Sequence, residues 1–158
     1  MRALILSLCA TLLSAIPAGA DPVVKVINFT ADWCPNCQIL NPRLDEAIES
    51  FDAGSIERVD LDVTRIRRNT SVVERGLIET ELLQMAESHQ VTYLWDWYGG
   101  ITGIAVAVSA DNGEALTCFM RPMTAIAIEK QLNLAKILAE NGRPGERKPN
   151  GPDCPVLQ

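Results

Sequence analysis

The period of the apolar positions changes along the chain, and each period predicts a different element. Residues 23–30 (VVKVINFT) form a short β-branched apolar run, which is typical of a buried strand. Residues 56–63 (IERVDLDV) alternate apolar and polar positions, which predicts a second strand with one exposed end. Residues 104–109 and 114–119 flank the Asp-Asn-Gly sequence at 111–113, and this arrangement predicts a hairpin.

Helical periodicity fills the segments between these strands. A first helix is predicted to start around Cys34–Cys37 and to continue to Phe51, just before the break at Ala53-Gly54. A final helix is predicted over 124–141, with Thr124 as its N-cap and a glycine directly after it. A second helix is predicted over 69–87, and its apolar stripe would consist of Val73, Leu77, Leu83 and Ala86.

The order of these elements predicts an α/β fold. A strand, a helix and a further strand imply a parallel pair joined by a right-handed crossover. The hairpin then adds antiparallel strands, so we expect a mixed central sheet flanked by helices. The second helix and the residues after it would be a helical insertion before the C-terminal hairpin.

The N-terminus has the pattern of a secretory signal. Arg2 precedes an apolar run over 3–16, and Ala18-Gly19-Ala20 has the small-x-small pattern of a cleavage site. The run is shorter than the roughly 20 residues of a transmembrane helix. We therefore expect cleavage after Ala20, with an uncleaved anchor as the alternative. A domain over 21–141 would follow, and then a flexible Pro/Gly-rich tail over 142–158.

Composition and charge narrow the class of protein. The 158 residues include 14 Lys and Arg against 20 Asp and Glu, and the net charge is −6. This acidic balance argues against a protein that binds nucleic acid. The single histidine, His89, leaves almost no material for a His-rich metal site or a Ser-His-Asp triad. For the short basic run of Arg65, Arg67 and Arg68, a solvated loop is the default interpretation.

Five cysteines are the unusual feature of the composition. Removal of the signal would take away Cys9 and leave an even number of thiols, which can all be paired in an oxidising compartment. Cys118 lies in the last predicted strand and Cys154 in the tail. Either these two form a second disulfide, or Cys118 is a small buried side chain and Cys154 stays free or pairs with another molecule.

Cys34 and Cys37 carry the candidate chemistry. Three positions apart at the start of a helix, their sulfurs lie on one face and within reach of a disulfide. Free N–H groups and the helix dipole stabilise a thiolate at Cys34, so we expect its pKa to lie below the free value of ~8.5. Cys34 is then the nucleophile and Cys37 the resolving thiol. Pro35 suits the first turn of the helix, because the N–H that proline lacks would have no hydrogen-bond partner there.

Metal binding is the alternative use of a Cys-x-x-Cys pair. A zinc site needs two further ligands. The remaining candidates are His89, Cys118 and Cys154, which have no paired spacing, so we expect no metal. Three methionines are either soft copper ligands beside the thiols or core side chains: Met85, Met120 and Met123.

Residues 26–47 (VINFTADWCPNCQILNPRLDEA) resemble the active-site strand and helix of the thioredoxin family. The resemblance includes Trp33 before the first cysteine and Pro42 five residues after the second. It extends over 23–138, strongly in the first forty residues and faintly between 64 and 98. It implies a three-layer thioredoxin-like fold. It also implies that Cys34 attacks and Cys37 resolves, with Trp33, Pro35 and Asn36 as the flank of the site.

Two positions depart from the family pattern. Asn28 stands where the family has a buried Asp that takes the proton of the resolving thiol, so we expect slower resolution. The family's cis-proline, which faces the disulfide, falls at Ala105. A cis bond without proline costs ~2.5–4 kcal/mol, so we expect a trans bond there. The loop that grips a client would then be altered.

An aromatic cluster precedes this loop. Residues 93–98 (YLWDWY) hold four of the chain's eight aromatic residues. One interpretation is an exposed surface that binds clients beside Cys34. The other is packing of the inserted segment into the core.

These features predict an exported, periplasmic or secreted thiol–disulfide oxidoreductase, with reduction as the favoured direction. No cofactor is needed, because the Cys34–Cys37 pair carries the electrons. The expected partners are disulfide-containing client proteins and a membrane electron donor, without nucleic acid and without membrane insertion once the signal is removed. Two alternatives stay open: a thiol oxidant or isomerase, and a non-catalytic, metal-carrying module for binding or assembly.

Overall fold

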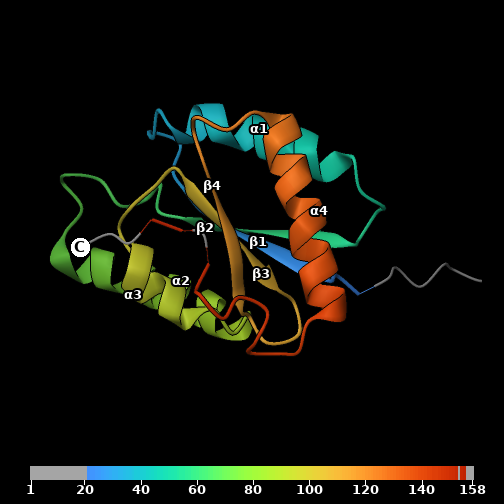
Figure 1. Ribbon diagram of the computed structural model, residues 1–158. Helices are drawn as coiled ribbons and strands as arrows, with labels where there is room; N and C mark the ends of the chain where they lie inside the picture. Colours follow the sequence, from blue (N-terminus) through green and yellow to red (C-terminus); the bar gives the residue numbers. More distant parts are fainter. Residues whose placement is uncertain (1–20, 153, 156–158) are drawn as a thin grey trace, which may run out of the picture.

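The computed structural model describes residues 21–152, 154 and 155, so the predicted signal at 1–20 lies outside the described residues. Four strands form one sheet in the order β2-β1-β3-β4 (Figure 1). β1 pairs parallel with β2 and antiparallel with β3, and β3 pairs antiparallel with β4. The predicted mixed sheet is confirmed. Its strands are β1 (Val24–Thr30), β2 (Ile56–Asp62), β3 (Ile104–Ser109) and β4 (Ala115–Met120).

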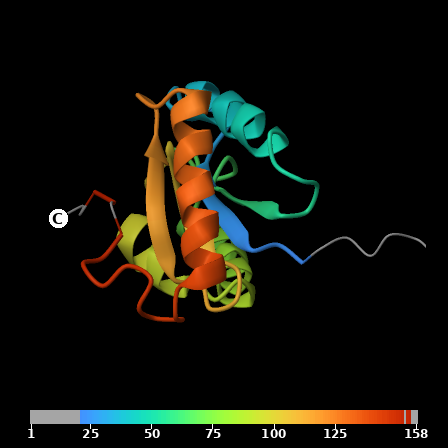
Figure 2. The ribbon, with the colours of Figure 1, turned by 45° about the vertical axis from the view of Figure 1, so that its right-hand side comes forward.

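Helices cover both faces of this sheet and complete three layers (Figures 1 and 2). Side chains of α1 (Cys37–Glu49) and α4 (Ala125–Asn141) share one apolar core with the sheet. Side chains of α2 (Val72–Ser88) and α3 (Thr92–Tyr98) share the core on the opposite face. α2 and the short α3 are the helical insertion expected before the hairpin.

The ends of α4 agree with the caps that the sequence predicts. Thr124 precedes α4, and its side chain accepts a hydrogen bond from the Ala127 N–H at 3.2 Å. Gly142 follows the last residue of the helix. α2 begins three residues later than predicted, because Ser71 caps it by accepting a hydrogen bond from the Glu74 N–H.

The apolar stripe predicted for α2 is wrong except at Ala86. The buried residues are Ile78, Leu82 and Ala86, whereas Val73 and Leu77 are 77% and 61% exposed. Adjacent apolar residues, such as Leu77-Ile78 and Leu82-Leu83, allow two stripes one position apart. Contact with β2 and α3 selects the stripe that the sequence leaves undecided.

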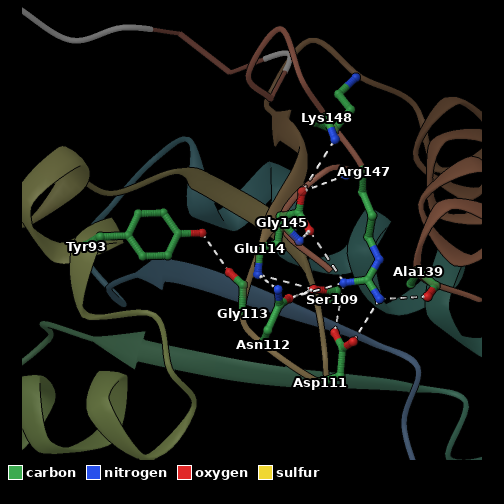
Figure 3. Close-up of polar contacts among 10 residues, drawn as sticks. All are labelled: Tyr93, Ser109, Asp111, Asn112, Gly113, Glu114, Ala139, Gly145, Arg147 and Lys148. Atoms are coloured by element: carbon green, nitrogen blue, oxygen red, sulfur yellow. Dashed lines mark hydrogen bonds and ion pairs between the residues drawn. The ribbon is translucent and has the colours of Figure 1, made fainter. Parts of the chain in front are cut away.

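The composition of the tail predicts that it is flexible, but in the structure its first part is attached to the domain. The Arg147 side chain is only 3% exposed and binds both carboxylate oxygens of Asp111, at 3.0 and 2.8 Å (Figure 3). Glu114 accepts hydrogen bonds from the backbone N–H groups of Gly145 and Arg147. The β3–β4 turn therefore holds the first part of the tail. Within the described residues, no helix is both long and apolar enough to span a membrane.

Candidate active site

Cys34 and Cys37 are joined by a disulfide at the start of α1. The helix begins at Cys37, and the side chain of Asn36 at its N-cap makes no capping hydrogen bond. Instead, the backbone N–H of Cys37 donates to the Sγ of Cys34 at 3.1 Å. The sulfur of Cys34 therefore takes the place of a capping oxygen, at the end of the helix that favours negative charge.

Both cysteines are nearly covered in this disulfide state. Cys34 is 3% exposed and Cys37 is 1% exposed, and both belong to the core shared with α2 and α3. The neighbouring Pro35 and Asn36 are exposed. Access to the Cys34 sulfur is therefore limited by the residues around it.

The residue that faces the disulfide from the loop before β3 is Gly103. A Cβ added to Gly103 would lie 3.5 Å from the Cys34 Sγ and 2.6 Å from the Asn36 Cβ. Its φ is +87°, and its N–H donates to the Phe29 carbonyl at 2.9 Å. Only glycine combines this backbone conformation with so close an approach.

Ala105 does not face the pair, so this placement from the sequence is wrong. It is buried within β3 opposite Asn28, in the core on the α1 and α4 face. Without a proline, nothing in the sequence marks the position that faces the disulfide. The Ile104–Ala105 bond is trans, as expected, and no described peptide bond is cis.

Trp33 is held in place by the loop that follows β2. Its indole Nε1 donates to the Thr64 carbonyl at 3.3 Å, and the N–H of Asp32 donates to the Thr64 Oγ1 at 2.8 Å. Arg67 donates to both oxygens of Asp32 at 2.8 and 2.9 Å. Trp33 itself is 41% exposed. The flank of the disulfide is thus attached to residues some thirty positions further along the chain, which the sequence does not reveal.

Asn28 is fully buried and lies against a carboxylate. Its Nδ2 donates to the Oδ1 of Asp60 at 2.7 Å and to the Oδ1 of Asn41 at 3.1 Å. Its own Oδ1 has no hydrogen-bond partner among the described residues. Asp60 also accepts from Arg58 at 2.8 Å. Asp60 is therefore the carboxylate in contact with the position at which Asn28 departs from the pattern of the resemblance.

Cys118 and Cys154 form a second disulfide, with their Cα atoms 5.1 Å apart. The bond joins β4 to the end of the tail and closes a loop across 36 positions. A loop of this length constrains the unfolded chain by about 3–4 kcal/mol in the chain-entropy model. The hydroxyl of Tyr98 donates to the Pro155 carbonyl at 3.0 Å beside it. The first of the two interpretations of this pair agrees with the structure.

Most of the aromatic side chains in residues 93–98 pack against the rest of the domain. Tyr98 is buried with its ring edge-on to Phe29, and Trp95 also contacts Phe29. The hydroxyl of Tyr93 donates to the Gly113 carbonyl at 2.7 Å, and burial raises the pKa of this phenol. Trp97 is the large exposed ring of the segment, at 44%.

The metal-binding interpretation needs a cluster of ligand side chains. In the described part of the chain, no group of three or more His, Cys, Asp or Glu side chains is arranged to hold a metal ion. Cys118 and Cys154 are bonded to each other, and Met85 and Met120 lie partly exposed on the surface.

The family model described as Thioredoxin matches residues 15–78, a range that includes β1, α1, β2 and the start of α2. None of the curated protein sequences matches the chain.

Solved structures that are similar to the chain include the following three. StoA from Bacillus subtilis has 20% identity and a TM-score of 0.45, over 72% of this chain and 84% of its own. A thiol:disulfide interchange protein of the thioredoxin family from Chlorobium tepidum TLS has 16% identity and a TM-score of 0.46, over 72% and 80%. A thioredoxin-related protein from Neisseria meningitidis serogroup B has 17% identity and a TM-score of 0.43, over 77% and 87%.

The sheet order, the two helical layers and the matched segment define a thioredoxin-like α/β protein. Its Cys-Pro-Asn-Cys pair lies at the start of the first helix, within the segment that the family model matches.

Proposed function

We propose that the protein is an exported thiol–disulfide oxidoreductase that reduces disulfides in client proteins. The observation that carries this proposal is the Cys37 N–H directed at the Cys34 sulfur at the start of α1. This donor and the helix dipole favour a thiolate at Cys34 in the reduced protein. Cys34 lies before α1, between the exposed Trp33 and Pro35, whereas Cys37 is part of the helix, so we take Cys34 as the attacking thiol.

The reaction proceeds in two exchanges. The Cys34 thiolate attacks one sulfur of a client disulfide, the client S–S bond breaks, and the released client thiolate takes a proton from solvent. The Cys37 thiol then loses its proton and attacks the Cys34 sulfur of the mixed disulfide. The second client thiol leaves, and the Cys34–Cys37 disulfide holds the two-electron oxidation. A membrane electron donor restores the dithiol.

Export is supported by the leader-like pattern at 1–20 and by the two disulfides of the described residues. Disulfides persist in oxidising compartments such as the periplasm or the extracellular space. We infer that the mature chain begins at Asp21, acts there as a protein free of the membrane, and has disulfide-containing proteins as its partners.

Redox equilibration of the mature chain tests the direction of electron flow. The fluorescence of Trp33 beside the pair is followed in glutathione buffers, in a Cys118→Ser/Cys154→Ser variant that isolates the first pair. A reduction potential near about −270 mV supports a reductant, and one near about −120 mV supports an oxidant. A pair that never exchanges would contradict the enzyme and favour the binding module.

A further inference from the structure

A cavity of about 260 Å³ lies beside the active-site tryptophan. Trp33 and Trp95 line it together with Val63 and Ile66, and the loop after β2 and the first half of α2 close its sides. A hydrogen bond from Trp33 to the Thr64 carbonyl and an ion pair between Arg67 and Asp32 hold the loop after β2 in place. This loop therefore stays next to Trp33, the residue that directly precedes Cys34. The cavity is therefore built into the site and does not depend on a mobile segment.

The charged residues of this cavity are mostly arginines, in a protein of net charge −6. Arg67, Arg68 and Arg75 contribute positive charge, and Glu79 is the carboxylate among the lining residues. Asp32 neutralises Arg67. Among the described residues, neither Arg68 nor Arg75 makes an ion pair, including with Glu79. Two guanidinium groups thus line the same cavity as Trp33 and Trp95 and form no ion pair among the described residues.

We propose that this cavity binds an acidic side chain, Asp or Glu, of the client segment that carries the disulfide. This inference rests on the proposed function and specifies its substrate class. Guanidinium groups bind carboxylates with charge-assisted hydrogen bonds, and the rings of Trp33 and Trp95 accept the apolar part of a glutamate. Because an extended chain advances about 3.3 Å per residue, a client residue one to three positions from the attacked cysteine reaches a cavity that adjoins Trp33. The preference selects acidic clients in spite of the protein's overall negative charge.

Binding is tested first, without any sulfur chemistry. The oxidised protein is titrated with two peptides that contain Ser in place of Cys and differ only in Glu or Gln two residues from that position. We expect the Glu peptide to bind about tenfold more tightly at low salt, with the difference shrinking as the ionic strength rises. Equal binding of the two peptides, or binding by neither, would overturn the proposal.

The variants Arg68→Gln and Arg75→Gln assign the effect to the cavity. Each is expected to weaken binding of the Glu peptide about fivefold and to leave the Gln peptide unchanged. Arg143→Gln removes the same charge from an exposed site in the tail and should change neither affinity. If Arg143→Gln weakens binding as much as the other two variants, the preference comes from overall charge and the cavity plays no part.

A separate measurement reports on the redox function alone. Exchange of the reduced protein with the small neutral disulfide of 2-mercaptoethanol needs no acidic group. Normal exchange without a preference for the Glu peptide overturns only the cavity proposal. Preferential binding of the Glu peptide without exchange overturns the enzyme and leaves an acid-binding site in place.

Discussion

The backbone N–H of Cys37 lies 3.1 Å from the sulfur of Cys34 and points at it. Asn36, at the N-cap, makes no side-chain capping hydrogen bond. The backbone itself thus supplies the hydrogen-bond donor to the Cys34 sulfur, and substitutions of surrounding side chains leave this donor intact.

The first prediction concerns the pKa of Cys34 in the reduced protein. In Cys37→Ala, with Cys118 and Cys154 still bonded, the rate of alkylation of Cys34 should follow a pKa about one unit or more below ~8.5. The same variant in urea is the control, because unfolding removes the helix start. Identical profiles in the folded and unfolded states would contradict the assignment of Cys34 as nucleophile.

The second prediction concerns the glycine against the disulfide. Gly103→Ala should destabilise the protein by more than 2 kcal/mol (about 1–2 from the positive φ and more from the clash with Asn36) and slow disulfide exchange. Gly100→Ala is the matched control, because Gly100 has a φ of +85° and an added Cβ there meets nothing within 4 Å. Chemical denaturation measures both variants. Equal losses would show that the contact with Asn36 and Cys34 has no energetic weight.

The third prediction concerns the buried amide at position 28. Asn28→Asp places a carboxylate where the amide now donates to Asp60 at 2.7 Å, so it should lower the unfolding free energy by about 1–3 kcal/mol at neutral pH. The double variant Asn28→Asp/Asp60→Asn keeps one carboxylate and moves it to the family's position. It should recover stability and resolve the mixed disulfide faster than the natural chain in single-turnover measurements. An unchanged resolution rate would mean that this carboxylate does not take the proton of Cys37.

The fourth prediction concerns the anchor of the tail. Arg147→Ala should cost about 2–3 kcal/mol of unfolding free energy, because it leaves Asp111 and Glu114 without their buried cation. Arg143→Ala, in the same segment but 87% exposed, should stay within about 0.5 kcal/mol of the natural chain. Proteolysis of the tail reports whether it detaches. Equal stability of the two variants would contradict the anchor.

The fifth prediction concerns acid stability. The hydrogen bonds from Arg147 hold the pKa of Asp111 below its usual range. A depressed pKa stabilises the folded protein above the unfolded value of about 3.9, and this contribution is lost as the pH falls through the folded pKa. Asp111→Asn should therefore lower stability at pH 7 and show a weaker loss of stability between about pH 4 and pH 2. Because Asp111 is half exposed, the difference should be small. Parallel stability curves of the two proteins would contradict this linkage.

The sequence predicts most of the local structure of this protein correctly. The strands, the hairpin turn, the caps of α4 and the position of Cys34 and Cys37 all follow from patterns within a few residues of each other. They could be predicted because periodicity, turn residues and capping residues act over one or two turns of chain.

Contacts between distant segments were decided only by the tertiary structure. The buried face of α2, the approach of Gly103 to Cys34, the insertion of Arg147 at Asp111 and the cavity beside Trp33 each join residues that are far apart in sequence. Adjacent apolar residues, a lone glycine or a tail arginine look alike in sequence whether they are buried or exposed. Their places depend on which surfaces remain uncovered once the sheet and helices have packed, and that is a property of the whole fold.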